Sequence, residues 1–333
     1  MNRPNATCGN AARARDSLTN APGPNPPVDD RSKNLGSARL AGTVCAGAAV
    51  CTDAVPSPLP TVARALHLHV LGSGSRGNCA LVEGPQGLIM IDDGFSRREV
   101  LTRMHELDLN ENDVRALVLT HEHSDHVSGV SVWVKRWEGP LFASQGTPDA
   151  RKYLACLPFE TFGPGEEFEV AGVRVQTFPT THDVVNPVGF RFSCQGDAIG
   201  YVTDTGTLPP GAMSLLHDAR ILAIESNHDV PMLRTGSYPR HLQDRIISEL
   251  GHLSNEQAAG ALRELVTDRT EHVVAMHISQ ENNRPSLAVR ALAAAVNAKL
   301  DNELGSTATL ERSEGLPALR IRAAGQNRPI SIL

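Results

Sequence analysis

The chain has 333 residues, of which 41% are hydrophobic and 20% charged, a composition typical of a globular protein. Its 31 Lys and Arg against 37 Asp and Glu give a formal net charge of −6. This charge argues against binding of nucleic acid through bulk charge alone, although a local basic groove stays possible. No apolar run approaches the roughly 18 residues of a membrane-spanning helix, so we expect no membrane association. The six Cys show no CxxC spacing, which argues against a disulfide scaffold and a Cys-rich zinc module.

Residues 1–63 differ from the rest of the chain. They contain no Phe, Tyr or Trp and are rich in Pro, Gly, Asn, Ala and Ser, so they cannot bury enough apolar area to offset the entropy of ordering. We expect a disordered low-complexity extension over 1–63 and a folded domain over 64–333. A targeting peptide is disfavoured by the acidic residues Asp16, Asp29 and Asp30. A genuine tail and a start codon assigned too far upstream fit the composition equally well.

From residue 65 onward the chain alternates between strand and helix patterns. Three strands over 67–71, 79–82 and 88–91 are joined by tight turns, and a capping box at Ser96–Glu99 begins a helix that runs to about residue 107. A buried strand covers 114–120, and the last third alternates strands with helices. Further strands are expected over 167–170, 173–178, 189–193, 198–202, 221–224 and 272–276, and further helices over 239–250, over 255–267 and from Pro285. This order predicts an α/β fold in which two packed sheets carry helices on their outer faces, a four-layer αββα sandwich.

The segment Gly72–Gly77 matches the GxGxxG pattern of dinucleotide-binding loops. That motif needs a helix to begin at the loop, whereas a strand and a Gly-Pro-Gln-Gly turn follow here, which indicates a hairpin. A tight turn is therefore the simplest interpretation. The backbone at Gly74 and Ser75 could also line an active site and contact an anion.

The segment Thr120–His126 carries the strongest chemical pattern in the chain. It reads His-x-His-x-Asp-His and follows a buried strand directly. Imidazole and carboxylate groups suit zinc, manganese or iron. Alternate residues at a strand end point the same way, so His121 and His123 can bind one ion, while Asp125 and His126 turn toward a second. Two adjacent ions can activate a shared water and stabilise a leaving oxygen.

This pattern resembles the metal-binding motif of the metallo-β-lactamase fold hydrolases. The resemblance implies that His182 completes the first site, that Asp204 bridges two ions, that His277 is the last ligand of the second site, and that Asp92 supports the ligands from behind. The implied cofactors are two divalent ions, Zn²⁺ or Mn²⁺. The remaining histidines, His67, His69, His105, His217 and His228, lack this support and are interpreted as surface or structural residues.

Three local features narrow the substrate. Lactamases of this fold commonly have Cys where Asp204 stands. The segment after Gly251 resembles the Gly-His-Ser-Thr segment of tRNase Z-type phosphodiesterases, which implies that His252 assists cleavage and is oriented by Glu225. The segment from His277 resembles a phosphate-side motif of nuclease-like members, which implies contacts from Ser279 and Asn283. The alternative is that Ser254 and Gln257 merely begin a helix and that Glu225 is a solvated strand end.

Taken together, these segments resemble the YycJ (WalJ) group of this fold. The resemblance implies a bacterial cytoplasmic phosphodiesterase, an exonuclease that acts 5′ to 3′ on DNA rather than RNA. In the implied mechanism a hydroxide between two ions, oriented by Asp125, attacks phosphorus, and His252 gives a proton to the leaving oxygen. Arg234, Arg240, Arg245 and Arg284 are either a basic track or ordinary solvated charges.

Two alternatives stay open. A glyoxalase II-like thioesterase, or another small-molecule hydrolase of this fold, needs the same ligands but no acid pair. A metal-binding regulatory protein without turnover is argued against by the intact Asp204.

Overall fold

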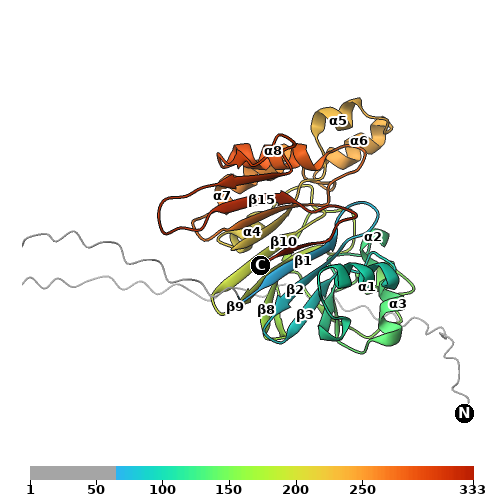
Figure 1. Cartoon of the computed structure of the whole chain (residues 1–333). Coiled ribbons are helices and arrows are strands. Elements are labelled where there is room, and N and C mark those ends of the chain that lie inside the picture. Colours follow the sequence, from blue (N-terminus) through green and yellow to red (C-terminus); the bar gives the residue numbers. More distant parts are fainter. Residues whose placement is uncertain (1–64) are drawn as a thin grey trace, which may run out of the picture. The chain divides into compact units, whose positions relative to one another are not determined.

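The computed structural model describes residues 65–333, so the extension expected over 1–63 lies outside the described residues. Two β-sheets pack face to face and carry helices on their outer faces (Figure 1). The αββα arrangement expected from the order of elements is therefore confirmed. None of the described helices is both long enough and apolar enough to span a bilayer.

The first sheet is formed mainly by the N-terminal part of the domain. Strands β1 to β3 form an antiparallel meander, and β3 to β6 run parallel. In spatial order the sheet contains β16 (Ile330–Ile332), β1 (His67–Gly72), β2 (Cys79–Gly84), β3 (Gly87–Ile91), β4 (Val114–Val118), β5 (Leu141–Ser144) and β6 (Phe159–Phe162).

The second sheet follows in the sequence. Its central strands β10, β11, β12 and β15 run parallel, so their C-terminal ends meet at one edge. In spatial order it contains β13 (Lys299–Leu300), β14 (Thr307–Leu310), β15 (Leu319–Ala323), β12 (His272–Met276), β11 (Ile221–Glu225), β10 (Asp197–Val202), β9 (Val188–Cys194), β8 (Val173–Pro179) and β7 (Glu167–Val170).

The helices form the two outer layers. The helices α1 (Arg97–Glu106) and α3 (Val130–Trp133) pack on the first sheet, and α4 (Pro210–Leu216), α7 (Asn255–Leu265) and α8 (Pro285–Ala295) pack on the second. Both capping boxes expected from the sequence form, at Ser96 and at Ser254. Three short helices, α2 (Ser124–Val127), α5 (Val230–Thr235) and α6 (Arg240–Ile247), complete the domain; Ser124–Val127 holds part of the His cluster.

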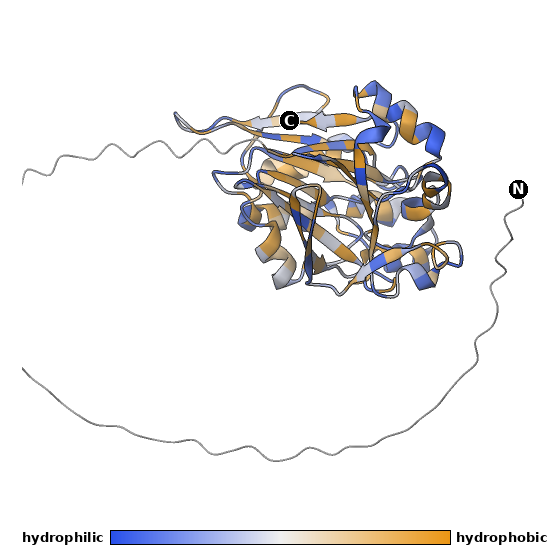
Figure 2. Cartoon of the chain, turned by 90° about the horizontal axis from the view of Figure 1, so that it is seen from below, coloured by the Kyte–Doolittle hydropathy of each residue, from blue (hydrophilic) through white to orange (hydrophobic). Residues whose placement is uncertain are grey.

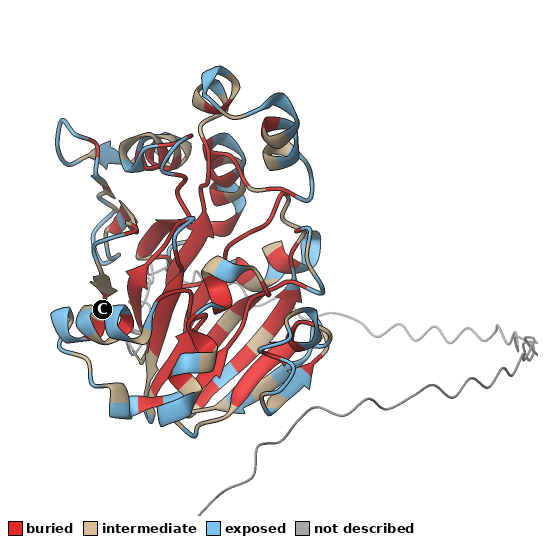
Figure 3. Ribbon diagram, turned by 90° about the vertical axis from the view of Figure 1, so that its right-hand side faces the viewer, coloured by how far each residue is buried: buried red, intermediate tan, exposed pale blue. Residues whose placement is uncertain are grey.

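Three apolar clusters hold these layers together. The cluster between the sheets takes alternate residues of each strand, such as Leu68 and Val70 of β1 and Ile89 and Ile91 of β3, while Leu88 and Met90 face the outer helices. Figure 3 shows the strands largely in red, as buried segments, and Figure 2 shows that many of the strand residues are hydrophobic. The clusters make a rigid frame from which loops project functional groups.

The C-terminal segment completes both sheets, which the sequence did not indicate. The strand Leu319–Ala323 pairs with β12 at the centre of the second sheet, and Ile330–Ile332 adds to the edge of the first sheet beside β1. The Gly72–Gly77 turn joins β1 and β2 as a hairpin, as expected, and begins no helix.

Candidate metal centre and active site

The candidate site lies where several strands end. Asp92 follows β3, Asp204 follows β10, and His277 follows β12 directly. All three have positive φ angles, of 58°, 51° and 49°, a conformation that non-glycine residues rarely adopt and that turns the side chain away from the direction of the strand. Such strain concentrates at functional sites because the surrounding structure must hold it in place.

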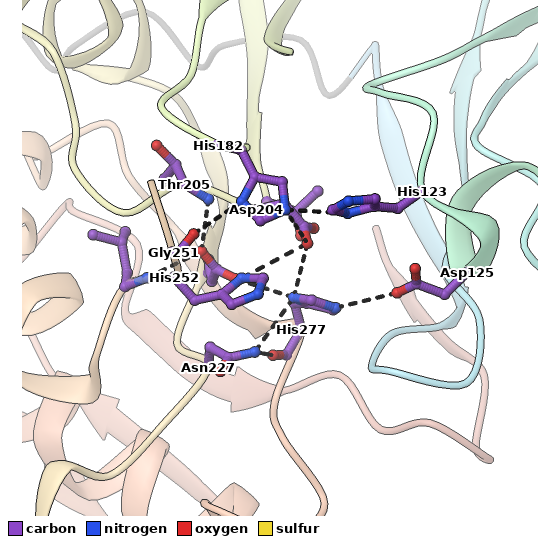
Figure 4. A network of polar contacts seen from close by, with 12 residues as sticks. His123, Asp125, His182, Asp204, Thr205, Asn227, Gly251, His252 and His277 are labelled. Carbon is purple, nitrogen blue, oxygen red and sulfur yellow. Dashed lines mark hydrogen bonds and ion pairs between the residues drawn. The ribbon is translucent and has the colours of Figure 1, made fainter. Parts of the chain in front are cut away.

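Six of the seven expected ligands form two adjoining groups in this region, and the seventh, Asp204, lies between them. Figure 4 shows five of the seven, His123, Asp125, His182, Asp204 and His277. The first group contains His121, His123 and His182, with His182 Nε2 3.2 Å from His123 Nδ1. The second contains Asp125, His126 and His277, in which Asp125 Oδ2 lies 3.6 Å from both His126 Nε2 and His277 Nε2.

Asp204 lies between the two groups. Its Oδ2 is 3.3 Å from His126 Nε2, and its Oδ1 is 3.9 Å from His182 Nε2. A carboxylate in this position can contact two ions at once.

Four of the five candidate imidazole ligands are held through the same ring nitrogen. In these four, Nδ1 contacts a fixed group of the protein, which leaves Nε2 for the centre of the site. The Nδ1 partners are Thr120 Oγ1 for His121, Asp92 Oδ2 for His126, the Gly251 carbonyl for His182 and Glu225 Oε1 for His277. Supporting contacts of this kind are typical of metal-binding histidines, because they fix the tautomer and the ring orientation.

The position expected for Asp92 agrees with such a supporting role. Its carboxylate accepts hydrogen bonds from the Thr120 amide at 2.8 Å and the Thr120 hydroxyl at 2.7 Å, and it lies 2.7 Å from His126 Nδ1. It therefore fixes the loop that carries the His cluster.

The electrostatics of the site favour cations. Burial alone would lower the pKa of His277, but the carboxylates of Asp204, Asp125 and Glu225 outweigh it and raise the pKa to about 10. The pKa of His126 is raised well above its usual range in the same way, with burial opposing Asp204 and Asp92. Burial lowers the pKa of His121 well below its usual value, which keeps that imidazole neutral, as a metal ligand must be.

The residues present fit divalent metal ions. His121 Nε2 and His277 Nε2 are buried atoms without a hydrogen-bond partner, although buried polar atoms nearly always have one. Imidazole nitrogens and carboxylate oxygens in this number suit zinc, manganese or iron. A cation bound among them would satisfy both atoms and offset the buried negative charge.

His252 and Glu225 form a close pair beside these groups. His252 Nδ1 lies 2.8 Å from Glu225 Oε1, while the His252 side chain lines the cleft. Glu225 is fully buried, so it is not a solvated strand end. Burial would raise the pKa of this carboxyl, but His252 and then His277 lower it to about 2.

Glu225 also has partners that the sequence did not reveal. Its carboxylate accepts hydrogen bonds from the Thr205 amide at 2.9 Å and the Leu253 amide at 3.1 Å, and it lies 3.0 Å from His277 Nδ1. The capping box at Ser254 coexists with this arrangement, so the helix start and the placement of His252 are two uses of one segment.

A cleft of about 280 Å³ opens above the ligands. Among the expected phosphate contacts, Ser75 and Ser279 line it. Gly74 and Asn283 do not line it. The Gly74 amide donates to Asn78 Oδ1, and the Asn283 side chain donates to the Ser226 carbonyl and to Asn255 Oδ1, so both are occupied elsewhere.

Of the two interpretations given to the four arginines, a basic track or ordinary solvated charges, the lining of the cleft favours the second. Arg245 is the only Lys or Arg among the residues that line it, and it pairs with Asp183. Arg234 pairs with Asp244 outside the cleft, and neither Arg240 nor Arg284 lines it.

Several contributors to the site were missed from the sequence. Asn78 donates to Asp125 Oδ2 at 3.3 Å and lies 3.0 Å from His126 Nε2, and the Ser73 hydroxyl accepts from the His277 amide at 2.7 Å. Both belong to the Gly-rich turn, so the signal was the turn itself.

Three of the histidines expected to be surface or structural residues lie away from the candidate ligands. His228 is fully buried, with neither ring nitrogen hydrogen-bonded. His67 and His69 both contact Glu83 Oε2, at 3.0 and 3.1 Å, in a network separate from the cleft.

Comparison with known proteins agrees with this geometry. The model of the beta-lactamase superfamily domain matches residues 88–278, more than half of the chain. The chain therefore belongs to the metallo-β-lactamase superfamily.

Within the superfamily, two relatives define the group. The exodeoxyribonuclease YycJ of Bacillus anthracis is 34% identical over 227 residues, which cover 67% of this chain and 86% of that protein. The exodeoxyribonuclease WalJ of Streptococcus pneumoniae serotype 2 is 34% identical over 225 residues, which cover 66% of this chain and 84% of that protein. The chain is a member of this YycJ and WalJ group.

Solved structures support the fold. The metallo-beta-lactamase fold protein YhfI from Bacillus subtilis superposes with a TM-score of 0.56 at 13% identity, covering 80% of this chain and 99% of that one. A diphosphatase of the PhnP family gives 0.53 at 17% identity, covering 80% and 97%. At these identities the likeness concerns the fold alone.

Proposed function

We propose that this chain is a metal-dependent exodeoxyribonuclease that removes nucleotides from the 5′ end of DNA. The observation that carries the proposal is the His252–Glu225 pair next to groups of His and Asp side chains that could hold metal ions. A sugar alkoxide is a strongly basic leaving group and needs a proton in the transition state, which a positioned imidazole can supply. The names of the relatives with 34% identity support DNA as the substrate.

Two divalent ions, Zn²⁺ or Mn²⁺, would be held by the two groups of ligands. His121, His123 and His182 would hold one, Asp125, His126 and His277 the other, and Asp204 would contact both. When bound, such ions supply Lewis-acid activation of water and neutralise charge on the phosphoryl oxygens.

The protein's own groups supply the remaining steps. Asp125 lies at the cleft and would orient the attacking water. Glu225 holds Nδ1 of His252, and among the described residues no hydrogen bond engages the other ring nitrogen, Nε2. The proton would pass from Nε2 to the leaving oxygen as the bond from phosphorus to oxygen breaks. Ser75 and Ser279 line the cleft and would contact a neighbouring phosphate.

A thioesterase of the glyoxalase II kind is the second candidate, because it would use the same ligands. A thiolate is a weak base and leaves without a proton, so thioester hydrolysis would not need the His252–Glu225 pair.

The relatives named exodeoxyribonuclease are bacterial, and bacterial DNA lies in the cytoplasm, which is the location we propose.

A substrate panel tests the proposal. Purified protein with added Mn²⁺ or Zn²⁺ is incubated with 5′-labelled single-stranded and double-stranded DNA, the same strands as RNA, and a glutathione thioester. We expect cleavage of DNA at a higher kcat/KM than RNA and little hydrolysis of the thioester. Faster turnover of the thioester than of any oligonucleotide would overturn the proposal.

A further inference from the structure

One wall of the cleft is apolar, although the rest is polar. Tyr238, Leu242, Ile246 and Leu250 all line it. The rest of the lining consists of metal ligands, His252, small polar residues, Gly251 and the charged pair of Asp183 and Arg245. Leu242 and Ile246 are four residues apart in Arg240–Ile247, so they lie on one face of that helix. Leu250 is 54% exposed, a large apolar side chain left open to solvent beside a charged site. We call these four residues the apolar wall.

The apolar wall is joined directly to the proposed proton donor. The His252 amide donates to the Ile246 carbonyl at 2.9 Å, and the Gly251 carbonyl contacts His182 Nδ1 at 3.0 Å. The backbone at Gly251 lies so close to Ile246 that no side chain fits at position 251, because a Cβ there would lie 2.2 Å from the Ile246 carbonyl oxygen. A group that rests on the wall is therefore held in a fixed position relative to His252.

The charge of the cleft restricts how a polyanion can bind there. Arg245 is the only Lys or Arg of the lining, and Asp183 already pairs with it. Proteins that bind single strands combine a positively charged groove with surfaces on which bases stack. Because the cleft largely lacks positive charge, contacts to the bases must contribute a larger share of the binding free energy. The cleft volume of about 280 Å³ is at the lower end of ligand sites, so it suits one nucleotide rather than a duplex.

We propose that the apolar wall binds the unpaired base of the 5′-terminal nucleotide, the one that leaves, so that the enzyme requires a single-stranded end. This rests on the proposed function. In removal of a 5′-terminal nucleotide, water forms a bond to phosphorus, the bond from phosphorus to O3′ of the terminal nucleotide breaks, and a proton goes to that O3′. Because His252 would give this proton, the sugar that carries O3′ lies beside His252. The base of the same nucleotide then lies against the wall that continues from it.

The test combines wall variants with substrates that lack one base. Tyr238→Ala and Leu250→Ala shorten side chains that are at least partly exposed, and such changes usually alter stability little. Tyr153→Ala is the matched control, because Tyr153 is 41% exposed and lies outside the cleft. Each protein is assayed on a single-stranded oligonucleotide, on the same strand abasic at the 5′-terminal position, and on one abasic at the second position. Bis(p-nitrophenyl) phosphate carries no nucleobase, and its kcat at saturating concentration reports the chemical step separately from binding.

We expect Tyr238→Ala to lower kcat/KM on the intact strand by roughly 5- to 150-fold, the range that stacking of one base usually contributes. The terminal abasic substrate should lower it by a similar factor in the wild type and very little in the variant, because both changes remove the same contact. Tyr153→Ala should have no effect, and the kcat of the nitrophenyl ester at saturating concentration should be unchanged in every variant.

Three results would overturn this inference alone. In the first, the variant and the terminal abasic site lower kcat/KM independently of each other. In the second, the effect of the variant disappears on the strand that is abasic at the second position instead of the first. In the third, the nitrophenyl ester loses as much activity as the oligonucleotide. If the wild type cleaves no oligonucleotide, the proposed function fails first and this inference with it.

Discussion

Replacement of His252 by Ala separates the chemistry of a phosphodiesterase from that of a thioesterase. The structure indicates that this change leaves the rest of the site intact. Glu225 loses one partner but keeps His277 Nδ1 and the amides of Thr205 and Leu253, so the buried carboxylate stays largely satisfied. We expect a stability cost of about 1.5–3 kcal/mol, that of one hydrogen bond to a charged group, and unchanged metal content.

The expected loss is in catalysis. General acid assistance typically contributes a factor of ~10²–10⁴, so kcat on a DNA strand should fall by about that factor. Bis(p-nitrophenyl) phosphate should lose much less, because nitrophenolate leaves without a proton. The matched control is His241→Ala, an exposed histidine of α6 that does not line the cleft, and its rates should equal the wild type.

Replacement of Glu225 by Gln should do more damage than the loss of His252. The carboxylate accepts four hydrogen bonds, and an amide group would turn a donor toward some of those donors, at about 1–3 kcal/mol for each one left unsatisfied. It would also release His277, so metal content should fall together with DNA cleavage.

Two results with His252→Ala would refute the acid role of His252. One is an equal loss of rate on DNA and on bis(p-nitrophenyl) phosphate, and the other is full nuclease activity.

Three further predictions concern metal, backbone and pH. Elemental analysis of metal-saturated protein should give about two ions per chain, and a wild-type value at or below one would contradict the binuclear site. Asp204→Ala should weaken metal binding at both sites, whereas Glu83→Gln, in the separate network of His67 and His69, should leave the metal content unchanged. Gly251→Ala should reduce DNA cleavage about 10²-fold because the added Cβ would displace the backbone beside His252, whereas Gly260→Ala, with open space around it, should keep full activity. Burial lowers the pKa of His228 to about 4, so as the pH falls from 6.5 to 4 this histidine takes up a proton in the unfolded chain but not in the folded one. The free energy of unfolding should therefore decrease by up to about 3 kcal/mol over this range. Urea titrations at several pH values should show that His228→Phe lacks this contribution to the pH dependence of stability.

Much of the candidate site could be predicted because the proposed metal ligands follow strands that the sequence marks clearly. Apolar runs before Asp92, His121 and His277 fix those strands, and parallel strands bring their C-terminal ends to one edge. The order of the ligands along the chain then resembles a known family, which supplies their pairing.

Other parts of the site depend on contacts between distant segments and gave no local signal. Glu225 and His277 are 52 positions apart in the sequence, so no local pattern indicates their contact, and no pattern around His228 indicates its burial. Leu242 and Ile246 have the spacing of an ordinary core-facing helix, so only the fold reveals that they line a cleft. The strand Leu319–Ala323 is short and pairs with β12 from more than forty residues away, which a local pattern cannot predict.

The polarity and product of DNA cleavage test the central claim most directly. A single-stranded DNA labelled at its 5′ phosphate is incubated with the metal-loaded protein, and the labelled products are separated by length over time. We predict that labelled mononucleotide appears from the first time point without labelled intermediates, and that Asp204→Ala abolishes it. A ladder of gradually shortening labelled strands, or an uncut strand under conditions in which the protein hydrolyses a thioester, would contradict the account.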